Sequence, residues 1–238
     1  MPTRLIPFVK VVVHLLCLVP LALLLFRFKH DSLGADPVNT ITHFTGDWAV
    51  YMLLVSLGVT PVRRMHARLS NLIRFRRMLG LYAFFYATLH LATYVFLFSG
   101  YDVPTAFAGV KAGHLSQVVT QFKLVWPTMW DDIRKRRFIQ VGFAAWVILL
   151  VLAITSPQIV LRAMGGKNWQ RLHRLVYVAA IFVIIHFWWL VKAGVRTPWR
   201  DTAVLVILLL ARIVYVALRR SAKAAVSQAR VPVSARPV

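Results

Sequence analysis

The chain alternates long apolar stretches with shorter polar and basic ones. Each apolar stretch is close to the roughly 20 residues that an α-helix needs to cross the hydrocarbon core of a bilayer. None shows the period-two alternation of a membrane β-barrel. The pattern therefore predicts an all-α membrane protein, a single bundle of six transmembrane helices. The predicted spans are residues 8–28, 44–61, 79–99, 138–156, 175–192 and 202–218, followed by a basic tail at 219–238.

The longest polar stretch, residues 100–137, has a pattern of its own. Apolar side chains recur there at helical spacing with polar side chains between them, which predicts an amphipathic helix on the outer membrane surface. An irregular, solvated loop is the alternative. The apolar positions are Leu115, Val118, Val119, Phe122 and Trp126, and we expect the helix to end at the aromatic segment 126–130.

Composition supports the membrane assignment. Apolar residues make up 59% of the 238 residues, and the mean hydropathy of +0.68 is hard to combine with a polar surface. The net charge is +22, and the basic residues lie mainly between the apolar runs. Anionic lipid headgroups rather than nucleic acid are the expected neighbours there. Cys17 is the only cysteine, which excludes an intrachain disulfide and a cysteine-ligated iron–sulfur or zinc centre.

The distribution of charge predicts the orientation of the bundle. Six spans put both termini on one side, and that side, with loops 62–78 and 157–174, holds more of the Lys and Arg residues. All seven aspartates lie on the other side, and the chain has no glutamate. Both termini are therefore predicted to be cytoplasmic. The basic segment 133–137 lies on the outer side and opposes this assignment. Its charges count less if the middle of the long outer stretch 100–137 forms structure of its own.

Two histidines lie deep inside predicted spans, where their nitrogens lack water and need a partner. His90 and His186 are each about eleven residues from the inner end of their spans, which places both about 17 Å into the bilayer. Two imidazoles at one level on two helices can hold one haem iron from opposite sides. Taken singly, either histidine could instead be satisfied by a backbone carbonyl or a hydroxyl.

His173 lies at the inner edge of the fifth span. It is about 20 Å along the helix from His186 and on a different face, so it cannot bind the same iron. With Arg171 and Arg174 beside it, a side chain facing the lipid headgroups is the alternative to a ligand.

Four segments carry motifs of one known family: SLGADPVNTITHFTG (32–46), VTPVRR (59–64), LIRFRRMLGLYAFFYATLHLATY (72–94) and NWQRLHRLVYVAAIFVIIHFWWLVK (168–192). They closely resemble the MsrQ family, also called YedZ, over nearly the whole chain. Members are haem-binding membrane subunits of the bacterial periplasmic methionine-sulfoxide reductase system. Two departures are Lys135-Arg136-Arg137-Phe138-Ile139, where the family pattern is nearer KRPYI, and a longer outer stretch 100–137.

The resemblance implies a ferric-reductase-like transmembrane fold in the bacterial inner membrane, with b-type haem and flavin mononucleotide (FMN). It implies that electrons come from the quinol pool, or from a cytoplasmic flavin reductase, and pass to a periplasmic molybdopterin-containing reductase that forms a heterodimer with this chain. The chain would then be an electron-transfer subunit rather than the subunit that reduces the substrate.

The resemblance also places the family's histidines on His90, His173 and His186. In relatives with two stacked haems a second histidine lies about thirteen residues before the first on each helix, but here Arg77 has that position on the third span. One haem is therefore favoured and two are possible, with His173 near a flavin, a propionate or a second iron.

Other candidate residues lie at the ends of the second and third spans. Arg74, Arg76 and Arg77 are candidates for binding haem propionates or a flavin phosphate, with ordinary headgroup anchors as the alternative. His43 is a candidate contact for a quinone or the periplasmic partner. Gly46 is interpreted as the start of a helix.

Two other classes of function compete with electron transfer. A histidine-based proton or metal-ion transporter usually has carboxylates inside its spans, and here no aspartate lies deep in one. A self-contained ferric reductase would need a nucleotide- and flavin-binding domain, for which the stretch after Leu218 is too short.

Overall fold

The computed structural model describes residues 6–65, 67–190 and 198–229. In these ranges it contains six helical segments that are long and apolar enough to cross a membrane. They are α1 (Ile6–Lys29), α2 (Pro37–Met65), α3 (Ile73–Thr93) with the π-helical η3 (Tyr94–Phe98), α6 (Arg137–Ile154), α8 (Gly166–Leu172) with α9 (Leu175–Leu190), and α10 (Trp199–Ala229). The described part of the chain has no strand. The prediction of an all-α bundle with six spans is confirmed.

Several helices extend beyond the apolar stretches. The second begins at Pro37 instead of residue 44, and α10 continues to Ala229, so much of the predicted tail 219–238 is helical. The expected inner loops contain η2 (Ala67–Leu72), α7 (Gln158–Met164) and α8. Hydropathy detects only the segment inside hydrocarbon, whereas the helical hydrogen bonds continue into the polar interface. Residues 191, 192 and 230–238 lie outside the described residues.

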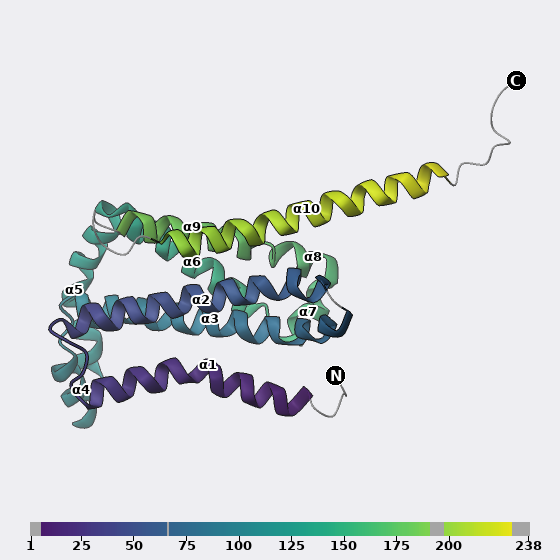
Figure 1. Cartoon of the computed structure of the whole chain (residues 1–238). Coiled ribbons are helices and arrows are strands. Elements are labelled where there is room, and N and C mark those ends of the chain that lie inside the picture. The colour runs from purple at the N-terminus through teal and green to yellow at the C-terminus, as the bar shows by residue number, and fades with distance from the viewer. Residues whose placement is uncertain (1–5, 66, 191–197, 230–238) are drawn as a thin grey trace, which may run out of the picture.

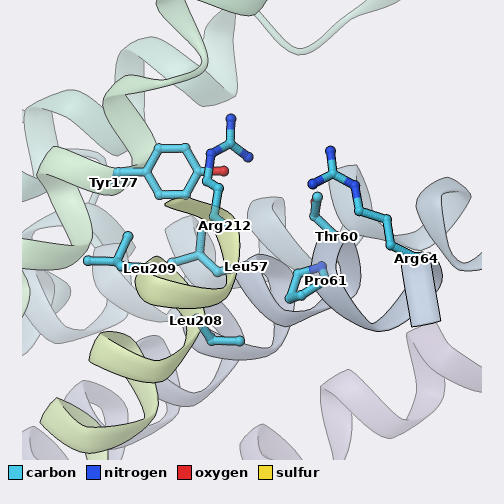
Figure 2. Close-up of a pocket in the computed structure, with 8 residues that line it drawn as sticks. All are labelled: Leu57, Thr60, Pro61, Arg64, Tyr177, Leu208, Leu209 and Arg212. Atoms are coloured by element: carbon cyan, nitrogen blue, oxygen red, sulfur yellow. The ribbon is translucent and has the colours of Figure 1, made fainter. Parts of the chain in front are cut away.

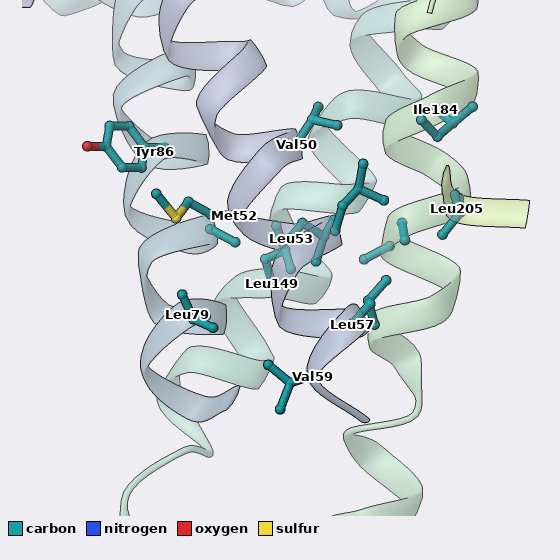
Figure 3. Packing of buried hydrophobic residues seen from close by; sticks show 14 of the residues in the cluster. Val50, Met52, Leu53, Leu57, Val59, Leu79, Tyr86, Leu149, Ile184 and Leu205 are labelled. Atoms are coloured by element: carbon teal, nitrogen blue, oxygen red, sulfur yellow. The ribbon is translucent and has the colours of Figure 1, made fainter. Parts of the chain in front are cut away.

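The central helix of the bundle is α2. Half of the residues in its most apolar window (50%) are buried inside the protein, against 17% in α3 and 6% in α10. It packs against α3 on one side and against α9 and α10 on the other (Figure 1). Figure 3 shows this core, which includes Val50, Met52, Leu53, Leu57 and Val59 from α2, Leu79 and Tyr86 from α3, Leu149 from α6, Ile184 from α9 and Leu205 from α10.

Polar contacts join α1 to α3. The hydroxyl of Tyr86 donates a hydrogen bond of 2.7 Å to the carbonyl of Cys17, and the Tyr82 hydroxyl lies 2.9 Å from Nδ1 of His14. Lipid tails can replace apolar contacts between helices, but they cannot replace hydrogen bonds. Such bonds therefore help to fix a peripheral helix.

The two ends of the bundle are built differently. Figure 1 shows α4 (Val103–Lys111) and α5 (Ser116–Lys135) crossing one end, and α7 and α8 at the other end, where α1 begins and α10 ends. The amphipathic helix predicted for the long polar stretch is present as α5, so the solvated loop is excluded. Its expected end at 126–130 is wrong, because the helix continues through Pro127 to Lys135. At a membrane surface water can pair with the carbonyl that a proline leaves free.

Helix α5 is attached to two spans. Tyr94, at the end of α3, donates a hydrogen bond of 3.3 Å to the carboxylate of Asp132. The Gln140 side chain of α6 donates to the carbonyl of Ile133 at 2.9 Å. These bonds hold α5 against α3, which carries His90, and against α6, whose Phe138 carbonyl lies beside His186.

Candidate functional site

His90 lies on α3 at the interface with α2. Its Nδ1 is 3.0 Å from the carbonyl oxygen of Thr42 on α2. A carbonyl can only accept a hydrogen bond, so Nδ1 carries the proton and Nε2 keeps its lone pair. The hydroxyls of Thr42 and Thr93 lie 3.1 Å apart, and Thr93 donates to the carbonyl of His90 at 2.7 Å.

His186 is held in the same way by a different pair of helices. It lies on α9, and its Nδ1 is 2.7 Å from the carbonyl oxygen of Phe138 on α6. The same reasoning gives Nδ1–H and a lone pair on Nε2. A backbone carbonyl thus satisfies one nitrogen of each ring, as the alternative interpretation of the sequence allowed, and leaves the other available to a metal.

A glycine lies beside each imidazole. Gly46 follows Thr42 by four residues on α2, and a Cβ placed on it would lie 3.1 Å from Nδ1 of His90. Gly142 follows Phe138 by four residues on α6, and its Cβ would lie 2.6 Å from Nδ1 of His186. In a helix the N–H of residue i+4 bonds to the carbonyl of residue i, which has a second lone pair. Without a Cβ at i+4, an imidazole can reach that second lone pair.

The two rings lie next to each other, one edge-on to the other. Their centres are 6.0 Å apart and their planes meet at 81°. A metal–imidazole bond of about 2 Å on each side, plus about 1.1 Å from nitrogen to ring centre, requires a separation of roughly 6 Å. Within the described residues no third His, Cys, Asp or Glu joins them in a metal-binding group. The separation of the pair is therefore the one that two imidazole ligands of a single metal ion would need.

His173 belongs to a separate region at the other end of the bundle. Its Nε2 is 3.2 Å from the Thr155 hydroxyl, and its ring stacks on Trp169 with centres 3.8 Å apart. It borders a cavity of about 500 Å³, which we call the inner cavity. Arg76 and Arg77 also border it, and Arg77 donates a hydrogen bond of 3.2 Å to the carbonyl of Ser156.

Comparison with known proteins decides the family. The model of the ferric reductase like transmembrane component matches residues 45–184. The protein-methionine-sulfoxide reductase heme-binding subunit MsrQ of Xanthomonas axonopodis pv. citri is 42% identical over 206 residues, 84% of this chain and 83% of the relative. The subunit of the same description from Herminiimonas arsenicoxydans is 39% identical over 216 residues, 90% of this chain and 88% of the relative. The chain belongs to the MsrQ family.

The structure brings together some of the cofactor-binding residues that were expected from the resemblance to the MsrQ family, and it separates others. His90 and His186 form one pair, and His173 lies with Arg76 and Arg77 at the inner cavity. Arg74 is exposed and is not among the described residues that border this cavity. His43 is exposed on α2, directly after Thr42.

Sequence reasoning missed two sets of residues. The first is the glycines: Gly46 is inside α2 and not at its start, and the spans contain other glycines that contact no histidine. The second is a group on α2 and α10 that borders the inner cavity: Thr60, Arg63, Arg64 and Arg212. VTPVRR was noted as a family motif, but nothing in its spacing shows that α10 packs beside it.

Proposed function

We propose that this chain is a membrane electron-transfer subunit that holds b-type haem between His90 and His186. The observation that carries the proposal is the pairing of these rings at 6.0 Å, each with Nδ1 bound to a backbone carbonyl. When bound, haem supplies a one-electron carrier whose potential depends on its axial ligands and their hydrogen bonds.

The residues of the chain prepare the site for that group. The carbonyls of Thr42 and Phe138 select the tautomer that presents Nε2, and such outer partners also raise the basicity of a ligating imidazole. Gly46 and Gly142 leave room for the rings. Because the rings are fixed by backbone atoms, little reorganisation is needed when iron binds.

The inner cavity supports a second cofactor site. We propose that it holds FMN, and that a single haem is present, because His173 is engaged by Thr155 and Trp169 and Arg77 stands thirteen residues before His90 on α3, where a second haem would need a histidine. A volume of about 500 Å³ is in the range of cofactor pockets.

The proposed direction of electron flow is outward across the bacterial inner membrane. Electrons would enter from the quinol pool or a cytoplasmic flavin reductase and leave to a periplasmic molybdopterin-containing methionine-sulfoxide reductase. The relatives are described as heme-binding subunits of a protein-methionine-sulfoxide reductase, which supports a methionine-sulfoxide reductase as the partner. Exposed His43, at the α2 end where α4 and α5 lie, is a candidate contact for that partner or a quinone.

A dithionite-reduced minus oxidised spectrum with pyridine haemochrome quantification tests this function. We expect about one b-type haem per wild-type chain, loss of haem in His90→Ala and His186→Ala, and retention in His173→Ala. The exposed His114→Ala is the matched control. Absence of haem from wild type made under haem-sufficient conditions would refute the electron carrier and favour a histidine-based transporter.

A further inference from the structure

The inner cavity is bordered by a second set of arginines, from α2 and α10, in addition to Arg76 and Arg77 of α3. Thr60, Arg63 and Arg64 lie on α2 at positions i, i+3 and i+4, which share one face of a helix. Arg212 of α10 borders the same space. A smaller adjoining pocket is lined by Thr60, Arg64 and Arg212, with Arg212 beside the ring of Tyr177 (Figure 2). We call Thr60, Arg63, Arg64 and Arg212 the α2–α10 group.

Two members of this group have unused hydrogen-bonding atoms. Among the described residues, the buried side-chain nitrogen and oxygen atoms without a hydrogen-bond partner are Oγ1 of Thr60 and Nε of Arg63. Thr60 is only 5% exposed. Buried polar atoms are almost always paired in native proteins, so two unpaired ones on residues that border the same cavity indicate a missing partner.

Aromatic rings, rather than carboxylates, hold the other two arginines. The Arg64 guanidinium lies 3.8 Å from the ring centre of Tyr215, and that of Arg212 lies 4.5 Å from the ring centre of Tyr177. Stacking uses the face of a guanidinium and leaves the N–H groups at its edge for other acceptors. No carboxylate is among the described residues that border the cavity.

These observations indicate that the missing partner of the α2–α10 group is a compact anion. Hydroxyl and guanidinium N–H groups are donors, and a phosphate monoester offers three acceptor oxygens and up to two negative charges at one point. The two propionates of a haem are separate single charges, whereas three of these four residues lie within about one helical turn.

We propose that the α2–α10 group binds a phosphate group, with the Thr60 hydroxyl and Arg63 Nε–H donating to its oxygens. The phosphate of FMN is one source, which rests on the flavin part of the proposed function. The headgroup of an anionic phospholipid is the other source of the same chemistry. Either would pair the donors that the protein itself leaves unpaired.

Flavin titrations of the full-length protein test this site. FMN and riboflavin differ only by the phosphate, so fluorescence quenching is measured for both in phosphatidylcholine nanodiscs. We expect FMN to bind at least tenfold more tightly than riboflavin, and Thr60→Val and Arg63→Gln each to weaken FMN about tenfold while leaving riboflavin unchanged. Arg63→Lys keeps the charge but lacks Nε and should weaken FMN too, whereas Thr60→Ser should restore binding.

The control is Arg220→Gln, which removes one exposed charge from α10 away from the cavity. If it weakens FMN as much as Arg63→Gln, or if wild type binds FMN and riboflavin equally, the flavin source is wrong. Nanodiscs containing phosphatidylglycerol test the lipid source, through Arg63-dependent retention of that lipid in native mass spectrometry. Failure of both arms overturns the phosphate site. Haem content of the same samples reports separately on the electron-carrier proposal.

Discussion

Replacement of Gly142 by alanine is the most direct test of how the haem site is built. The new Cβ would lie 2.6, 2.8 and 3.1 Å from Nδ1, Cε1 and Cγ of His186. All three atoms belong to a rigid ring on a packed helix, so the contact cannot be relieved by rotating the far end of a flexible side chain. Either the imidazole or helix α6 must move.

The required displacement can be compared with the tolerance of a ligand. Ordinary contacts of a Cβ begin at 3.4 Å, so the shortest contact is about 0.8 Å too short. Functional side chains must be held within about 0.5 Å of their working position. The 2.7 Å bond to Phe138 would also be strained, at a net cost of about 0.5–1.5 kcal/mol. Overpacking adds about 1–3 kcal/mol, only partly offset by the gain of about 1 kcal/mol from replacing a helical glycine by alanine.

We expect Gly142→Ala to weaken haem binding at least tenfold and to convert the remaining haem from low-spin to high-spin. Gly46→Ala, with its closest contact at 3.1 Å, should keep haem with a shifted midpoint potential. Gly58→Ala and Gly80→Ala are matched controls on α2 and α3, because their closest contacts are 3.8 and 3.5 Å. Haem titration, electron paramagnetic resonance and redox potentiometry give the comparison. Wild-type binding and spin state in Gly142→Ala would refute the reasoning.

Three further predictions concern the bundle. Tyr86→Phe should destabilise the protein by about 0.5–1.5 kcal/mol, measured by thermal or denaturant unfolding in detergent, because the hydrogen bond from the Tyr86 hydroxyl to the Cys17 carbonyl is lost; no change would show that this bond does not hold α1. Tyr94→Phe should increase hydrogen exchange in α5 without removing haem, because the bond to Asp132 is lost; unchanged exchange would contradict that attachment. Green fluorescent protein fused to the C-terminus should fluoresce and alkaline phosphatase should be inactive, and the opposite pattern would reverse the predicted orientation.

The sequence predicts the depth of residues better than their neighbours. Hydropathy locates six spans, and counting along them places His90 and His186 at one level, where the structure pairs them. Depth follows from rise per residue alone, so it does not depend on which helices are adjacent. The extensions of α2 and α10 were not predictable in this way, because polar residues continue a helix without an apolar signal.

The α2–α10 group shows the opposite limit. Arg63 and Arg212 are about 150 residues apart in the chain. Arg63 is adequately explained in the sequence as a positive charge near the inner membrane surface, whereas Arg212 lies inside the predicted span 202–218. Only the packing of α10 on α2 brings them to one cavity. The unpaired donors at Thr60 and Arg63 are likewise a property of the packed structure, since any threonine or arginine has donors that lipid headgroups or water could satisfy.

The two halves of the proposed haem site are built on the same principle, and this explains why glycine matters there more than its position in the sequence suggests. In each half a carbonyl and a glycine four residues later lie on one helix, and the histidine comes from its closely packed neighbour: α3 for α2, and α9 for α6. The imidazole can reach the carbonyl only where no Cβ covers it. Tautomer selection and ring orientation therefore depend on the absence of one methyl group on each side. A glycine that looks like a helix start in the sequence, Gly46, lies in the structure against the imidazole of His90, a proposed metal ligand.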